Sequence, residues 1–159
     1  MPRTVTCLWF DTEAEEAAAF YTSVFPESEI LGVTRYGAEA PDREGTAMTV
    51  NFRLGDAEYV GLNGGPQYSF SEAISFQIMC ADQAEVDHYW SRLTEGGEEG
   101  PCAWLKDRFG VSWQVVPTRL LQLISDPDPG RSQRAVQAMM GMKKIVIADL
   151  ERAVDQVPA

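Results

Sequence analysis

Residues 4–26 read TVTCLWFDTEAEEAAAFYTSVFP, and in this stretch a predicted strand is followed at once by a predicted amphipathic helix. Its first seven residues are rich in β-branched and aromatic side chains, which favour a strand. After Asp11 and Thr12, apolar residues recur at positions 17, 20, 21 and 24, the spacing of one helix face. Pro26 ends the helix because proline cannot continue it.

Residues 74–97 read ISFQIMCADQAEVDHYWSRLTEGG and repeat this order. Asp82 is placed as an N-cap, with Glu85 three residues later as in a capping box. Aligning the aromatic pairs of the two helices gives an offset of about 69 residues, as expected for two copies of one supersecondary unit. Further strands are predicted at residues 28–36, 46–54 and 57–62 in the first half, and at 102–106 and 111–116 in the second.

The rest of the chain is predicted to be helical, with helices at 118–124 and 131–142 and a third short element at 145–154. Val136, Met139 and Met140 are expected to form an apolar face, which suits core packing or a subunit contact. We therefore expect one compact α+β domain made of two βαβββ modules with a helical C-terminal extension. The expected boundaries are 1–66, 67–117 and 118–159.

The composition excludes several classes of protein. Among the 159 residues, 24 are acidic and 13 basic, so the net charge of −11 would repel a nucleic-acid backbone. No apolar run approaches the roughly 20 residues that span a bilayer, and the first residues resemble no targeting peptide. The three cysteines form no CxxC pair, which argues against a disulfide framework or a structural zinc site. We expect a cytoplasmic protein that binds neither nucleic acid nor membranes.

Three long strings carry a resemblance: CLWFDTEAEEAAAFYTSVFP at 7–26, LNGGPQYSFSEAISFQIMC at 62–80 and EEGPCAWLKDRFGVSWQVVP at 98–117. They resemble the PhnB-like branch of the vicinal oxygen chelate superfamily, which includes glyoxalase and bleomycin-resistance proteins. Members of this branch are often labelled 3-demethylubiquinone-9 3-methyltransferase. The resemblance implies paired βαβββ modules, a homodimer, and a cleft between the modules that in the wider superfamily holds a divalent metal.

In that superfamily the metal ligands lie on strands one, four, five and eight, and are usually His or Glu. A divalent transition metal needs converging imidazole, thiolate or carboxylate donors, for which an amide is a weak substitute. His88, the only histidine, is expected on a helix. We therefore predict no metal ion and no cofactor. The side chains that the four strands offer are Cys7, Glu58, Asn63, Cys80 and Gln114.

The methyltransferase label also lacks support in the residues. A conventional methyl-donor site has a Gly-rich turn between a strand and a helix. Here the pair at 64–65 is followed by Pro66, and the pair at 96–97 follows a helix. No such turn is predicted.

The side chains that remain in the predicted cleft are neutral polar groups and aromatic rings, which suit a small planar or apolar ligand. With Phe76 and Ile78 in the core, period-two alternation turns Ser75 and Gln77 to the other face. Taken singly, each tryptophan is better explained by core packing. The predicted ligand-binding residues are Trp9, Asn63, Ser75, Gln77, Trp104 and Gln114.

Three functions follow from these patterns. The first is metal-independent binding of a small organic molecule. The second is a superfamily enzyme such as an isomerase, lyase, dioxygenase or the labelled methyltransferase, which would need a metal or the thiol of Cys102, with Lys106 and Arg108 lowering its pKa. For Cys102 the plainer interpretation is a small residue at the start of a strand. The third is a dimeric subunit that binds no ligand.

Overall fold

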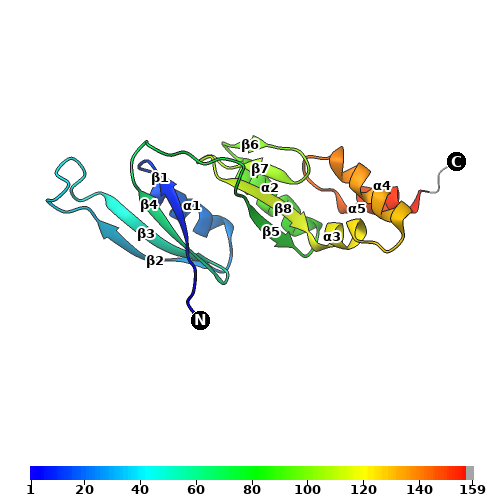
Figure 1. Cartoon of the computed structure of the whole chain (residues 1–159), viewed down its shortest axis with the longest axis horizontal. Coiled ribbons are helices and arrows are strands. Elements are labelled where there is room, and N and C mark those ends of the chain that lie inside the picture. The colour runs from blue at the N-terminus through cyan, green and yellow to red at the C-terminus, as the bar shows by residue number, and fades with distance from the viewer. Residues whose placement is uncertain (157–159) are drawn as a thin grey trace. The chain divides into compact units, whose positions relative to one another are not determined.

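The computed structural model describes residues 1–156, which form two compact units, Met1–Phe70 and the chain from Ser71 onward. Each unit contains a four-stranded sheet and a helix that packs on it (Figure 1). Within the described residues, no helix has the length and apolar character needed to cross a membrane.

In the first unit, a buried helix covers one face of a mixed sheet. The strand order is β1-β4-β3-β2, with β1 parallel to β4 and the other pairs antiparallel. Tyr21 of the helix is fully buried, as are Val50 and, almost completely, Phe52 of the sheet. The elements are β1 (Thr6–Phe10), α1 (Ala14–Val24), β2 (Ser28–Arg35), β3 (Ala47–Leu54) and β4 (Ala57–Asn63).

The sheet of the second unit has the same topology. Its order is β5-β8-β7-β6, again with the first two strands parallel and the others antiparallel. The repeat predicted from the sequence is therefore confirmed, and with it the α+β fold of two βαβββ modules. The elements are β5 (Phe76–Cys80), α2 (Gln83–Thr94), β6 (Glu98–Glu99), β7 (Trp104–Lys106) and β8 (Ser112–Pro117).

Helix α2 begins as its sequence predicts. The Asp82 carboxylate accepts the backbone N–H of Glu85 at 2.9 Å, and the Glu85 carboxylate accepts the N–H of Ala81 at 2.8 Å. The first bond satisfies one of the backbone donors that a helix N-terminus leaves without an intrahelical partner, and the second holds the residue just before the N-cap. The buried side of α2 presents Val86 and Trp90.

Three more helices complete the second unit: α3 (Thr118–Ile124), α4 (Pro129–Met140) and α5 (Ile147–Asp155). The apolar face predicted for α4 is partly wrong, since Met140 is 66% exposed while Ala135 is fully buried. The helix starts two residues earlier than predicted because Asp128 caps it and Pro129 takes the first helical position. Ala135, with Met139 beside it, packs against the core formed with Leu120, Leu150 and neighbouring residues.

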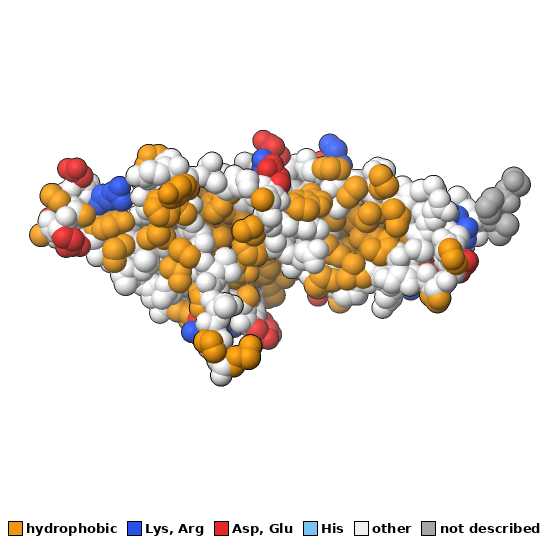
Figure 2. All heavy atoms as spheres, in the orientation of Figure 1, with side chains coloured by type: hydrophobic (Ala, Val, Ile, Leu, Met, Phe, Trp, Pro, Cys, Tyr) orange, Lys and Arg blue, Asp and Glu red, His pale blue; other side chains and the backbone are white. Residues whose placement is uncertain are grey.

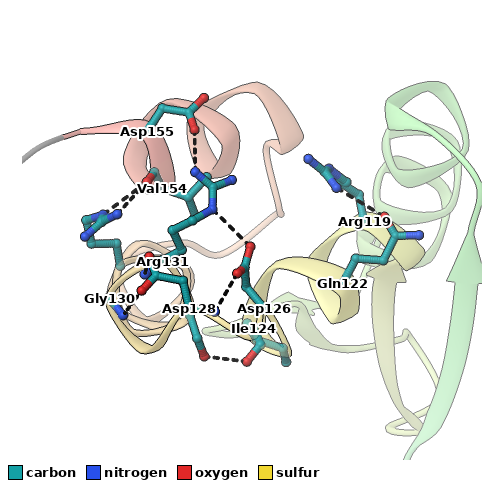
Figure 3. A network of polar contacts seen from close by, with 11 residues as sticks. Arg119, Gln122, Ile124, Asp126, Asp128, Gly130, Arg131, Val154 and Asp155 are labelled. Atoms are coloured by element: carbon teal, nitrogen blue, oxygen red, sulfur yellow. Dashed lines mark hydrogen bonds and ion pairs between the residues drawn. The ribbon is translucent and has the colours of Figure 1, made fainter.

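Polar contacts join these three helices (Figure 3). The Arg131 guanidinium donates to the Asp126 carboxylate at 3.0 Å and to Asp155 at 2.7 Å, so it bridges the start of α4 and the end of α5. Arg134 donates to the carbonyl of Val154. The extension is also joined to α2, because the Gln83 side chain donates to one backbone group of the 145–147 segment and accepts from another.

The segment before β7 differs from the predicted strand at 102–106. Cys102 and Ala103 have φ values of 56° and 77°, in the left-handed region that non-glycine residues rarely adopt. Their N–H groups donate to the carbonyls of Met142 and Lys143 at 2.8 and 2.9 Å. The extension therefore holds this turn in place, and the strand begins only at Trp104.

Candidate functional site

Four of the six predicted ligand-binding residues lie together on the second sheet. Gln77, Gln114 and Trp104 occupy one register row across β5, β8 and β7. The Gln77 amide donates to the Gln114 carbonyl oxygen at 3.3 Å, and the Gln114 amide donates to the Ser75 hydroxyl at 2.8 Å. The alternating burial of β5 confirms that Gln77 faces away from the core, as predicted. We call these four side chains the amide–tryptophan row.

A cavity of about 380 Å³ adjoins this row at Trp104. The turn at Gly100 and Pro101 forms another part of its wall, so the strained segment before β7 leads directly into the cavity lining. Ser112 of β8 also lines it, opposite Lys106 in the register of the sheet. The volume falls within the range of roughly 300–1,000 Å³ that is typical of small-molecule sites.

The Ser112 hydroxyl distinguishes this cavity. Ser112 is only 2% exposed, and its hydroxyl oxygen forms no hydrogen bond within residues 1–156. Buried polar groups in folded proteins are nearly always paired, because an unpaired one costs about 1–3 kcal/mol. An unpaired hydroxyl beside a cavity is therefore a good candidate for a group that contacts a ligand.

The rim of the cavity is acidic. Glu72 forms an ion pair with Lys106, and Glu98 lies opposite Lys106 in the antiparallel pair of β6 and β7. The hydrogen bond and charge of Glu72, with a smaller contribution from Glu98, raise the pKa of Lys106. Glu99 accepts the indole N–H of Trp90 at 2.8 Å. Acidic side chains accordingly gather over β6 in Figure 2, with a basic one beside them.

The other two predicted residues, Trp9 and Asn63, belong to the first unit. The Trp9 indole N–H donates to the carbonyl of Gly65 at 2.9 Å, and its ring contacts Tyr68 edge-on. Asn63 is 7% exposed, and its side chain accepts the N–H of Ala14 at 2.8 Å and donates to the carbonyl of Ala47 at 3.1 Å. These bonds give Asn63 a structural role at the start of α1. Ligand binding by either residue stays a prediction.

A comparison with protein families matches residues 2–116 to the 3-demethylubiquinone-9 3-methyltransferase family, which includes the PhnB-like proteins. The chain belongs to this family. The matched range contains both βαβββ modules and ends within β8, so α3, α4 and α5 of this PhnB-like protein lie beyond it. Among curated proteins, no significant match was found.

Solved structures agree with the assignment. A protein from Bacillus cereus described as a "putative 3-demethylubiquinone-9 3-methyltransferase, PhnB protein" is 32% identical, and the match covers 73% of this chain and 99% of that one with a TM-score of 0.65. Protein PA1353 from Pseudomonas aeruginosa is 20% identical, with coverages of 74% and 98% and a TM-score of 0.62. The fosfomycin resistance protein FosX from Listeria monocytogenes, solved with Mn(II) and sulfate, is 18% identical, with coverages of 72% and 89% and a TM-score of 0.51. The last two show a shared glyoxalase-like fold.

The family name implies a methyl donor, and the PhnB-like fold described above does not fit one. The connections from β1 to α1 and from β5 to α2 are residues 11–13 and 81–82, and neither contains glycine. Gly96 follows α2, where its positive φ of 74° ends the helix. Within the described chain, no Gly-rich turn therefore leads from a strand into a helix, as a conventional methyl-donor site requires.

A divalent metal, which the wider superfamily implies, does not fit these residues either. The described residues contain no group of three His, Cys, Asp or Glu side chains that could hold an ion. Cys80 is fully buried, and burial, with the charges of Glu85 and Asp82, raises the pKa of its thiol to about 12. Gln114 is engaged in the amide–tryptophan row, and Glu58 pairs with Arg3.

The two basic side chains that could lower the pKa of Cys102 lie next to carboxylates instead. Lys106 pairs with Glu72, and Arg108 lies 4.0 Å from Glu95. Asp107, between them, is 3% exposed and accepts three hydrogen bonds: from the N–H groups of residues 109 and 111 at 2.8 and 3.1 Å, and from the indole of Trp113 at 2.8 Å. These contacts favour the plainer interpretation, in which residues 106–108 stabilise a turn.

Sequence reasoning missed the acidic rim of this PhnB-like site. Glu72 was hidden in the link between modules, and β6 is only two acidic residues long, with no alternation to mark it as a strand. A usable signal was present, since consecutive glutamates before Gly100 and Pro101 are unusual as the edge of a sheet. Trp113 is 3% exposed and belongs to the core.

Proposed function

We propose that this PhnB-like protein binds a small organic molecule, without a metal ion, at the amide–tryptophan row and the adjoining cavity. The observation that carries the proposal is the buried hydroxyl of Ser112, a residue that lines the cavity beside Trp104; among residues 1–156 this hydroxyl has no hydrogen-bond partner. The indole offers a flat apolar surface, and the amides of Gln77 and Gln114 offer neutral donors and acceptors for orienting a ligand. Homodimer assembly and a cytoplasmic location remain predictions.

A thermal-shift screen of small aromatic amines, alcohols and amides, performed with EDTA present, tests the proposal. A compound at 100 times its Kd stabilises the native protein by about 2.7 kcal/mol, which raises the Tm by about 5–10 °C for a chain of this size. We expect at least one such compound. The shift should persist in EDTA, because no metal takes part.

Two tryptophan variants locate the binding. Trp104→Ala is expected to abolish heat of binding in isothermal titration calorimetry. Trp9→Ala, in the first unit, should retain it if the site lies on the second sheet alone, so this variant also tests the sequence-based prediction that Trp9 binds the ligand. Both side chains are of intermediate exposure, so the variants are matched in chemistry and accessibility. Loss of binding in Trp9→Ala alone, or a complete dependence of binding on added metal, would overturn the proposal.

A further inference from the structure

The charges around the cavity are unbalanced. The residues that line it include three glutamates, Glu72, Glu98 and Glu99, and one lysine, Lys106, which gives a formal charge of −2. The Glu99 carboxylate accepts the indole N–H of Trp90, which leaves Glu72 and Glu98 to face a ligand. Lys106 is already neutralised by its ion pair with Glu72. Within residues 1–156, no ion pair engages Glu98. A ligand entering the cavity therefore meets uncompensated negative charge at β6.

The apolar wall suits a cation as well. Trp104 is half-buried and lines the cavity beside Pro101. Tryptophan is the aromatic side chain that attracts cations most strongly, through the negative face of its ring. A positively charged ligand would thus be attracted from two directions, by the ring and by the carboxylates of β6.

Ser112 adds an observation that is independent of the acidic rim. Ser112 lines the same cavity, and its buried hydroxyl has no hydrogen-bond partner in the described chain. A hydroxyl oxygen has two lone pairs and accepts readily from an ammonium N–H. Next to a rim of carboxylates, a ligand that donates is favoured over one that brings a further negative charge.

We propose that the ligand of this cavity is a small organic cation, an amine attached to a planar apolar body. The ammonium group lies near Ser112 and Glu98, and the planar body lies against Trp104. This inference rests on the proposed function and adds the charge and class of the ligand. The net charge of −11 of the whole chain also favours the approach of a cation.

Three probes with the same ring and nearly the same size test the charge: 2-phenylethylamine, 2-phenylethanol and phenylacetate. Titration calorimetry of the full chain at pH 7 is expected to show the amine binding about 10-fold or more tightly than the alcohol. Phenylacetate should bind more weakly than both. The preference for the amine should decrease at high salt, because the rim is solvent-accessible.

The outcomes separate the two proposals. If the alcohol or the carboxylate binds as tightly as the amine, the cation proposal is wrong and the proposed function stands. If none of the three binds, the cation proposal is wrong, and the thermal-shift screen alone then decides the proposed function. If Trp104→Ala binds the amine as tightly as the wild type does, the amine binds at an acidic surface elsewhere, and the cation proposal is wrong.

Charge-neutralising variants sharpen the test. Glu98→Gln is expected to weaken binding of 2-phenylethylamine by about 2- to 5-fold, the range for a solvent-accessible ion pair, and to leave 2-phenylethanol unchanged. Ser112→Ala should weaken the amine without lowering the Tm of the free protein, because the hydroxyl has no protein partner to lose. Glu16→Gln, on the exposed side of α1, is the control and should change neither probe.

Discussion

Replacement of Asp107 by alanine is expected to destabilise the second unit by about 4 kcal/mol. Two of the groups that donate to its carboxylate are buried, the N–H of Val111 and the indole N–H of Trp113. Hydrogen bonds to a charged group contribute about 1.5–3 kcal/mol each, so losing both costs about 3–6 kcal/mol. The third donor, the N–H of Phe109, is only partly buried and can be hydrated.

Urea denaturation followed by tryptophan fluorescence and circular dichroism measures this loss. In a thermal melt, it corresponds to a decrease in Tm of about 8–16 °C. A double-mutant cycle with Trp113→Phe isolates the indole bond and should yield a coupling energy of about 2 kcal/mol. Asp56→Ala, at an exposed turn, is the control and should remain within about 0.5 kcal/mol of the wild type. A loss below about 1 kcal/mol for Asp107→Ala, or no coupling, would refute the reasoning.

Three further outcomes are expected. Asn63→Leu removes two buried hydrogen bonds to the backbone and should lower the free energy of unfolding in urea by about 2 kcal/mol; a loss below about 0.5 kcal/mol contradicts this role. Burial, with nearby carboxylates, raises the pKa of the Cys80 thiol to about 12. Ellman's reagent at pH 8 should therefore leave Cys80 unmodified in the native protein while the half-exposed Cys102 reacts. Mass spectrometry that finds Cys80 labelled would disprove the burial of this thiol. The N–H of Asp128 and an arginine of α4 lower the pKa of Asp126, so the ionised carboxylate stabilises the fold above pH about 4 and this effect is lost as the pH falls through the folded-state pKa. Melting curves of Asp126→Asn and of the wild type should therefore differ at pH 7 and converge in acid. A difference that stays constant with pH would contradict this role of Asp126.

The repeat was predictable because its signals are local and redundant. A strand pattern, a capping box and an amphipathic helix occur in one order, and that order occurs again about 69 residues later. The capping bonds of Asp82 and Glu85 form as the spacing predicts. Alternation along β5 also predicted the facing of Gln77, and register then brought Gln114 and Trp104 beside it.

Features that depend on distant parts of the chain were not predictable. The positive φ angles of Cys102 and Ala103 are stabilised by carbonyls some 40 residues later in the sequence, so no local pattern announces them. The apolar face of α4 was misplaced for a related reason: methionines suggested the buried side, while close packing selected the small Ala135. The acidic rim arises from the folding of Glu72 next to β7, a contact that no spacing encodes.

The hydrogen bonds between the 102–103 turn and the C-terminal extension connect the wall of the cavity to a part of the chain outside the two βαβββ modules. Two backbone amides connect the 142–143 segment to the turn, and three residues of the adjoining stretch, Gly100, Pro101 and Trp104, line the cavity. The family match ends at residue 116, so the two carbonyls that hold the turn belong to a part of the chain outside the matched range. Substitutions that move the 142–143 segment are therefore expected to shift the cavity wall at Gly100 and Pro101 even where the matched residues stay the same.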